Sequence, residues 1–327
     1  MLNDLGMYRI LVIGWPVSPA QSWTKNNTYV DVARIYREDV TKLEKKQKDI
    51  SFHTPRWLQF CDALTPSTWY GEWKRKIKEY DTVILIDEVR GGDVFEYILE
   101  NNPSCNLCVF YDSPVQVGSP KEPSLYKSLP VRFFTCDRKI AKTYNIPFMP
   151  YFYIFSPFDF NDYHSLSSKT IEQDVFFIGE EKGDRKKRIE DIKSVLDKAG
   201  LTYDLRLVPQ NRHKKSLLGK KNHKQAYMPY SEAIEHVRCS KAVLELISDG
   251  QTGITQRPYE ALFFKKKLIT TSPEVKNYDF YCDENIFVLG GRDLKELPQF
   301  LNSPFYEIDE NITEKYTFAS WLKGFLK

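Results

Sequence analysis

Short apolar runs recur along the 327-residue chain and alternate with amphipathic segments. Continuous apolar runs of this length are typical of strands buried on both faces of a parallel sheet. In the first half, the pattern predicts strands at 8–14, 82–87, 107–112 and 131–136 and helices at 26–49, 69–80, 92–101 and 124–127. This alternation predicts an open, mostly parallel sheet covered by helices.

The second half repeats the pattern after a loop-rich segment, 146–170, that contains Pro147, Pro150 and Pro157. Its predicted strands are 174–179, 203–208, 243–247 and 268–271, and its predicted helices include 185–199 and 230–238, the latter capped by Ser231. A chain of this length accommodates two domains of about 150 residues. We therefore place the domain boundary in the loop-rich segment.

The most informative stretch is 243–271, which predicts a strand, a polar loop, a helix and a strand. Pro258 suits the first turn of the helix, and we place Glu260 in the same turn, where a carboxylate favours the helix dipole. A glycine-containing loop that leads into a helix N-terminus binds phosphates well, because backbone N–H groups point outward there. Arg257 adds a fork that matches a diphosphate, and Glu260 offers acceptors for ribose hydroxyls.

The same stretch resembles the nucleotide-binding element of GT-B-fold glycosyltransferases, in particular the bacterial proteins related to lipopolysaccharide and capsule synthesis and the CgeB-like transferases. Their pattern G-x-x-x-R-x-x-E-A-x-x-x-x-K-x-L-I-T is matched here by Gly253, Arg257, Glu260, Ala261, Lys266, Leu268, Ile269 and Thr270. The segments 133–139, 174–179 and 275–288 fit the family in the expected order. The resemblance covers about half of the chain.

The resemblance implies an α/β fold of two Rossmann-like domains that face a cleft, the GT-B fold. Residues 1–155 would form the acceptor domain and 170–305 the nucleotide-sugar donor domain, with a C-terminal helix in 306–327 packing back on the first. Many retaining members carry two glutamates separated by seven residues. The partner position of Glu260 is Thr252, so the retaining signature is absent and we expect inversion. Glu245 lies further back, within a predicted strand, and does not fill that position.

The donor-nucleotide site is predicted from residues in two loops that follow strands of the second half. Ligands of parallel α/β sheets bind beyond the carboxyl ends of strands. The expected residues are Gly179, Arg185, Gly250, Thr252, Gly253, Thr255, Arg257 and Glu260. A plain helix start, stabilised by its own dipole, is the alternative for Arg257 and Glu260.

Acceptor-side residues are expected after the first strand, at Gly14 and Trp15, although a core role for Trp15 is equally open. An inverting transfer needs a general base for the acceptor hydroxyl. The candidates are carboxylates at strand ends, at most one of them acting: Asp87, Glu88, Asp112 and Asp137. Each of these carboxylates is alternatively an ordinary helix cap.

The composition and motifs of the chain argue against several classes of binding partner and cofactor. The net charge of +3 gives no general attraction to nucleic acid, and the first loop lacks the G-x-G-x-x-G spacing of dinucleotide sites. The only C-x-x-C, Cys105 to Cys108, has no second pair, and the histidines are dispersed, so we predict neither a metal nor another cofactor.

No secretory signal or membrane-spanning run is evident, which predicts a cytoplasmic protein. The basic stretch 212–224 leaves peripheral contact with the inner membrane face open.

These observations together predict a hexosyltransferase-type enzyme. It would move a sugar from a nucleotide-sugar, preferably a UDP-sugar, to a growing bacterial lipopolysaccharide, O-antigen or capsule, with a glycan or lipid-linked glycan as acceptor. Two alternatives stay open: a noncatalytic nucleotide- or glycan-binding module, and a transferase of another group on the same scaffold. The sequence does not identify the sugar, the base of the nucleotide, the linkage or the oligomeric state.

Overall fold

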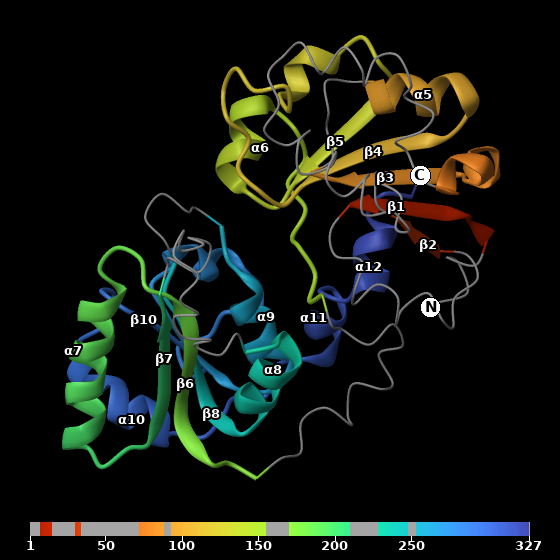
Figure 1. The fold of residues 1–327 in the computed structure, drawn as a ribbon. Helices are drawn as coiled ribbons and strands as arrows, with labels where there is room; N and C mark the ends of the chain where they lie inside the picture. Colours follow the sequence, from red (N-terminus) through yellow and green to blue (C-terminus); the bar gives the residue numbers. More distant parts are fainter. Residues whose placement is uncertain are drawn as a thin grey trace, which may run out of the picture. The chain divides into compact units, whose positions relative to one another are not determined.

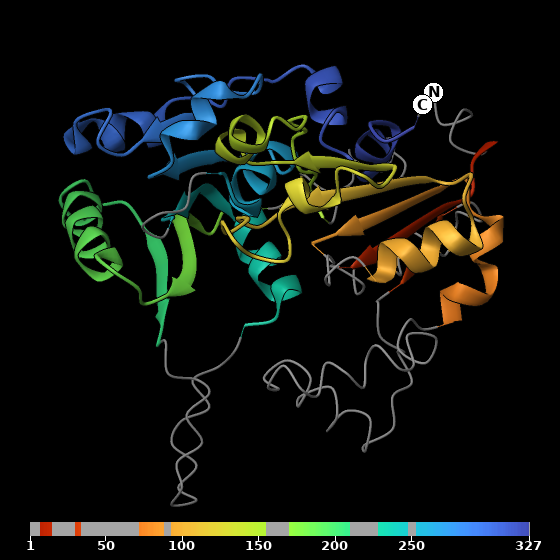
Figure 2. The same cartoon turned by 90° about the horizontal axis from the view of Figure 1, so that it is seen from above.

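The computed structural model describes residues 7–14, 30–33, 72–87, 93–154, 170–209, 228–247 and 253–326. The chain divides into two compact units. Unit 1 comprises residues 1–158 together with 318–327, and unit 2 comprises residues 159–317. Each unit contains one five-stranded parallel sheet with helices around it, so the fold is α/β with two Rossmann-like units (Figures 1 and 2).

The sheet of unit 1 has the strand order β2-β1-β3-β4-β5, and all its strand pairs are parallel. The strands are β1 (Ile10–Gly14), β2 (Val30–Ala33), β3 (Thr82–Ile86), β4 (Asn106–Tyr111) and β5 (Val131–Thr135). The helical elements are η2 (Glu72–Glu79), α5 (Asp93–Asn101), η3 (Pro123–Tyr126), α6 (Arg138–Tyr144) and, from the end of the chain, α12 (Phe318–Lys323). The β1/β3 junction is the point where the order of the sheet reverses.

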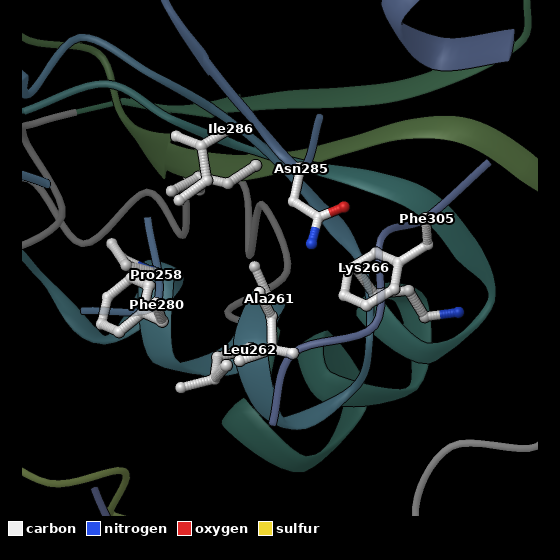
Figure 3. A pocket seen from close by; sticks show the side chains of 10 residues that line it. Pro258, Ala261, Leu262, Lys266, Phe280, Asn285, Ile286 and Phe305 are labelled. Atoms are coloured by element: carbon white, nitrogen blue, oxygen red, sulfur yellow. The ribbon is translucent and has the colours of Figure 1, made fainter. Parts of the chain in front are cut away.

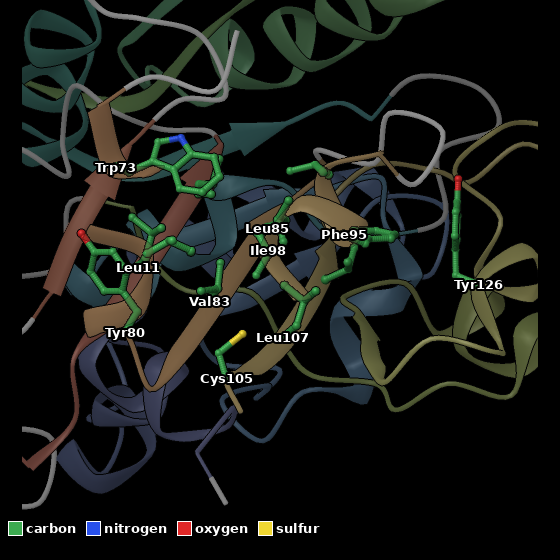
Figure 4. Close-up of a cluster of buried hydrophobic side chains, with 14 of the residues drawn as sticks. Leu11, Trp73, Tyr80, Val83, Leu85, Phe95, Ile98, Cys105, Leu107 and Tyr126 are labelled. Atoms are coloured by element: carbon green, nitrogen blue, oxygen red, sulfur yellow. The ribbon is translucent and has the colours of Figure 1, made fainter. Parts of the chain in front are cut away.

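Successive side chains of a strand point to opposite faces of the sheet, so the strands of unit 1 contribute to two separate apolar layers. One layer joins Leu107 and Val109 of β4 to side chains of η2 and α5, including Trp73 and Phe95 (Figure 4). On the other face, Phe110 contacts Trp321 of α12 edge to face. The last residues of the chain therefore complete the core of unit 1.

Unit 2 has the order β10-β9-β8-β6-β7, which is the same topology as unit 1, with the reversal between β6 and β8. Its strands are β6 (Gln173–Glu180), β7 (Tyr203–Val208), β8 (Ser240–Glu245), β9 (Lys267–Thr270) and β10 (Ile286–Val288). The helical elements are α7 (Arg185–Lys198), α8 (Tyr230–Arg238), α9 (Gln256–Phe263), η5 (Pro273–Asn277), η6 (Leu294–Glu296), α10 (Leu297–Asn302) and α11 (Glu310–Glu314). Helices α7 and α10 cover one face through Ile192, Leu196 and Phe300.

Two local predictions are wrong. Residues 30–33 form an edge strand within the segment 26–49 that was predicted to be helical, because Val30 and Val32 pair with β1. The rest of that segment lies outside the described residues. Ser231 does not cap α8, which begins one residue earlier at Tyr230, after Pro229, and has no side-chain cap. No described helix combines the length and the apolar character needed to cross a bilayer.

Candidate functional site

The N-terminus of α9 in unit 2 is built around the buried carboxyl group of Glu245, the last residue of β8. Its Oε1 accepts hydrogen bonds from the amide and the hydroxyl of Thr255, at 3.1 and 2.5 Å. Its Oε2 accepts one from the hydroxyl of Thr270 at 2.5 Å. Burial raises the pKa of Glu245, and the threonine hydrogen bonds oppose this effect. The carboxyl group fixes the loop that enters α9 to the strand ends.

Thr255 is the N-cap residue of α9. Its hydroxyl donates a hydrogen bond to Glu245. The same hydroxyl oxygen accepts a hydrogen bond from the amide of Arg257 at 3.1 Å. This arrangement satisfies one of the amides that a helix start leaves without a partner. At Gly253, two residues earlier, a Cβ atom would meet no atom of the described residues within 4 Å.

Arg257 is held by Glu260, which has no exposed surface. The Arg257 Nη1 donates to Glu260 Oε2, and the Tyr230 hydroxyl donates to Glu260 Oε1 at 2.6 Å. Both oxygens of Glu260 thus accept hydrogen bonds from within the chain. The prediction that Glu260 lies in the first turn of the helix is wrong, because α9 begins at Gln256 and Glu260 falls in its second turn. The contact orients the guanidinium group of Arg257, whose side chain is 18% exposed.

Arg185 bridges the two strands at the reversal point of the unit 2 sheet. It is the first residue of α7, and its guanidinium donates to the carbonyl of Glu180 at 2.9 Å and to the carbonyl of Leu246 at 2.5 Å. Arg185 therefore links the carboxyl ends of β6 and β8. Gly179, in β6, packs against Phe177, whose ring would lie 2.7 Å from a Cβ atom at that position.

An apolar pocket elsewhere on α9 has a different character (Figure 3). Pro258, Ala261 and Leu262 of the helix line it, together with Lys266, Leu268, Phe280, Asn285, Ile286, Phe305 and Ile308. Asn285 is satisfied by the backbone of Tyr306, to which it donates at 2.7 Å and from which it accepts at 2.8 Å. Neither Arg257 nor Glu260 lines this pocket, so it is separate from the polar start of α9.

In unit 1, predicted residues converge at the carboxyl ends of the parallel strands. Gly14 ends β1 with φ 121°, a conformation that favours glycine, and it pairs in register with Ile86 of β3. Asp87 follows β3 and Asp112 follows β4, and their side chains interact by a hydrogen bond. Burial and the neighbouring Asp87 raise the pKa of Asp112 to about 8.

Asp137 has the ordinary structural role that was the alternative for each carboxylate. It is the N-cap of α6, where its Oδ1 accepts from the amides of Lys139 and Ile140 at 2.7 and 3.1 Å. The remaining predicted residues, Trp15, Glu88, Gly250 and Thr252, lie outside the described residues, as does the whole basic stretch 212–224 that suggested membrane contact.

Sequence reasoning did not place Tyr230 in the site, named Thr270 only as part of the family pattern, and set Glu245 aside. A carboxylate at the end of an otherwise apolar buried strand was the available signal for Glu245, because such a group needs specific hydrogen-bond donors. A scan of the sequence against protein-family models finds no match, and a search of curated proteins finds none either.

Proposed function

We propose that the protein is a glycosyltransferase that moves a sugar from a nucleotide-sugar, preferably a UDP-sugar, to a growing bacterial surface glycan such as lipopolysaccharide, O-antigen or capsule. The donor would bind on unit 2 and the acceptor on unit 1, in a GT-B arrangement, without a metal. The surface-glycan setting rests on the resemblance of the segment 243–271. The observation that carries the proposal is the preorganised start of α9.

Three features of this helix start suit a diphosphate. The partial positive charge of the helix N-terminus attracts anions, and no atom of the described residues crowds a Cβ position at Gly253, which favours a close approach to the backbone. Arg257 supplies a fixed guanidinium group.

An enzyme is favoured over a noncatalytic binding module by the second cluster, at the strand ends of unit 1. A plain binding module does not need two carboxyl groups in contact, whereas a transferase needs a base with a pKa near the working pH. The Asp87–Asp112 contact provides such a group. Glycosyl transfer to a hydroxyl group uses both features, a diphosphate site and a base.

The test is thermal stabilisation of the full chain by UDP, GDP, CDP, ADP and dTDP and by their sugar derivatives. At about 100 times its dissociation constant, a bound nucleotide adds roughly 2.7 kcal/mol to stability. We expect one base to give a clear shift, and Arg257→Ala to abolish it. No shift with any nucleotide would contradict the proposal.

Two further variants separate loss of binding from loss of folding. Arg257→Ala leaves the buried Glu260 without its cation, so the double variant Arg257→Ala/Glu260→Gln removes that charge as well and should also fail to respond. Arg206→Ala is the matched control, because Arg206 is a more exposed cation of unit 2 that pairs with Asp204. Arg206→Ala should retain the full response to the nucleotide.

A further inference from the structure

The carboxyl groups of Asp87 and Asp112 are brought together by the register of adjacent strands. Ile86 of β3 pairs with Phe110 of β4, so the residues that follow these strands emerge side by side. Asp87 has φ 55°, in the left-handed region that side chains other than glycine rarely adopt. Its amide donates to the carbonyl of Phe110 at 3.0 Å, which holds this conformation. Residues held in this region cluster at active sites and ligand-binding segments.

Two polar atoms beside this carboxyl pair are buried and lack a hydrogen-bond partner among the described residues. They are Oδ1 of Asp87 and the hydroxyl of Tyr151. Tyr151 is 9% exposed, its ring stacks on Phe110 with centroids 5.5 Å apart, and its hydroxyl interacts electrostatically with Asp112 and Asp87. Buried polar atoms without partners are costly, so their retention calls for an explanation.

A single ligand hydroxyl group has the hydrogen-bonding capacity to serve both atoms. A hydroxyl group donates one hydrogen bond and accepts others, whereas a carboxyl oxygen such as Oδ1 of Asp87 can accept and the Tyr151 phenol can donate. A sugar hydroxyl placed between them would donate to Asp87 and accept from Tyr151.

The other titratable and charged groups around the pair come from several elements. Cys136, after β5, has its thiol 3.6 Å from the carbonyl of Tyr111, and burial raises its pKa. Lys121 lowers the pKa of Asp112, while burial and Asp87 raise it. The remaining neighbours are Asp137, which caps α6, and the phenols of Tyr111 and Tyr151, whose pKa values are raised chiefly by burial.

Within the function proposed above, on which this step rests, we propose that the Asp87–Asp112 pair is the base that accepts the proton of the acceptor's hydroxyl group, held there by Tyr151. As the proton moves to the pair, the hydroxyl oxygen forms a bond to the anomeric carbon of the donor. The bond from that carbon to the diphosphate oxygen breaks, and its electron pair leaves with the nucleoside diphosphate. The pair later releases the proton to solvent.

Two carboxylates in contact make a stronger base than one. Burial first, and then the hydrogen bond and the charge of Asp87, raise the pKa of Asp112 to about 8, so the pair binds a proton more tightly than an isolated aspartate does. A base is most effective when its pKa lies near the working pH, and an isolated aspartate is far weaker.

The first measurement does not depend on the nucleotide. Difference infrared spectra of the full chain between pH 6 and 9 should show a carboxylic acid that ionises around pH 8. The band should vanish in Asp112→Asn and in Asp87→Asn, and should persist in Glu96→Gln, which removes an exposed carboxylate of α5 in the same unit. Absence of any carboxyl group that ionises in this range would overturn the assignment.

The second measurement follows UDP release from UDP-glucose, UDP-galactose and UDP-N-acetylglucosamine, with water as acceptor. The rate should rise with pH through about 8, because the ionised pair is the active form. Asp112→Asn should remove this rise and lower the rate at least tenfold at pH 8.5, while its UDP-induced thermal shift is retained. Tyr151→Phe should lower the rate but keep the rise.

The outcomes of these measurements distinguish the base assignment of the Asp87–Asp112 pair from the proposed donor site on unit 2. A UDP-induced shift with an unchanged pH profile in Asp112→Asn, or with no UDP release from any donor, overturns the base assignment and leaves the donor site standing. Absence of any nucleotide-induced shift removes the proposed function and with it this catalytic role, even if the infrared band shows that the pair holds a proton.

Discussion

The hydroxyl of Thr255 donates a 2.5 Å hydrogen bond to the buried carboxyl group of Glu245. This contact ties the first turn of α9 to the end of β8, ten residues earlier in the chain. It also dictates which way the hydroxyl points, because the same oxygen accepts from the amide of Arg257. The buried carboxyl group of Glu245 therefore holds the polar start of α9 in place.

Removing the Thr255 hydroxyl should loosen this helix start. Thr255→Val deletes both the cap and a donor to Glu245, and we expect a loss of about 2 kcal/mol, since a cap is worth roughly 1 kcal/mol and an unsatisfied buried group adds to it. Urea unfolding and amide exchange in α9 measure the effect. Thr255→Ser, which keeps the hydroxyl, is the matched control and should stay within about 0.5 kcal/mol of the parent. Equal losses in the two variants would exclude the cap as the cause.

Glu245 should couple nucleotide binding to proton uptake. Its pKa in the folded protein is raised, so its contribution to stability is present below its ordinary value of 4.5 and is lost as the pH rises through the folded pKa. An anionic diphosphate nearby raises that pKa further, so affinity should fall with rising pH. Calorimetry in two buffers of different ionisation enthalpy measures the uptake.

In Glu245→Gln, UDP should bind with less proton uptake and a flatter dependence of affinity on pH. The amide keeps the size of the side chain and an acceptor for the threonine hydroxyls, so folding should be largely retained. Glu190→Gln, on the exposed face of α7, serves as the control and should behave as the parent. Undiminished proton uptake in Glu245→Gln would assign the titrating group elsewhere.

Asp112 should make unit 1 less stable at alkaline pH. Its pKa rises from 3.8 to about 8 on folding, so the stability that its protonated form contributes is present below about 3.8 and is lost progressively up to about pH 8. Asp112→Asn should remove this loss and leave the variant more stable than the parent at pH 9 by several kcal/mol, since one unit of pKa shift corresponds to about 1.4 kcal/mol. Unfolding curves at pH 5 and pH 9 give the comparison. An equal pH dependence in parent and variant would contradict the buried pair.

The end of the chain should stabilise unit 1 selectively. Trp321 of α12 is 3% exposed and contacts Phe110 and Phe152, both in unit 1. Trp321→Ala should cost about 3–5 kcal/mol, the usual range for such a core truncation. Hydrogen exchange should accelerate in β4 and β5 and stay unchanged in β6 and β8. Tyr306→Ala, at an exposed site of unit 2, is the control and should leave exchange unchanged in all four strands. Equal acceleration in both units after Trp321→Ala would contradict the assignment of α12 to unit 1.

The strands were largely predictable because parallel strands buried on both faces are continuous apolar runs, as in 82–87 and 107–112. The edge strand β2 was missed because Asp31 interrupts its short apolar pattern and the surrounding segment is charged. Helix α6 was also missed, since its only buried residue is Ile140 and its start depends on the Asp137 cap.

Of the candidate site, Arg257 and Thr255 were predictable because local sequence places them at a helix start. The contacts of Glu245, Tyr230 and Tyr151 were not, because each joins residues from different elements. The same holds for the Asp87–Asp112 contact, which depends on the register between β3 and β4. Sequence alone supplied the two carboxylates but not their proximity.

The central claim is that a nucleoside diphosphate binds at the start of α9. Amide hydrogen exchange with and without the nucleotide that stabilises the protein tests it most directly, because exchange reports local opening segment by segment. We predict slower exchange at 253–257, and loss of this protection in Arg257→Ala/Glu260→Gln. Binding of the nucleotide with unchanged exchange at 253–257 and protection elsewhere would contradict the account.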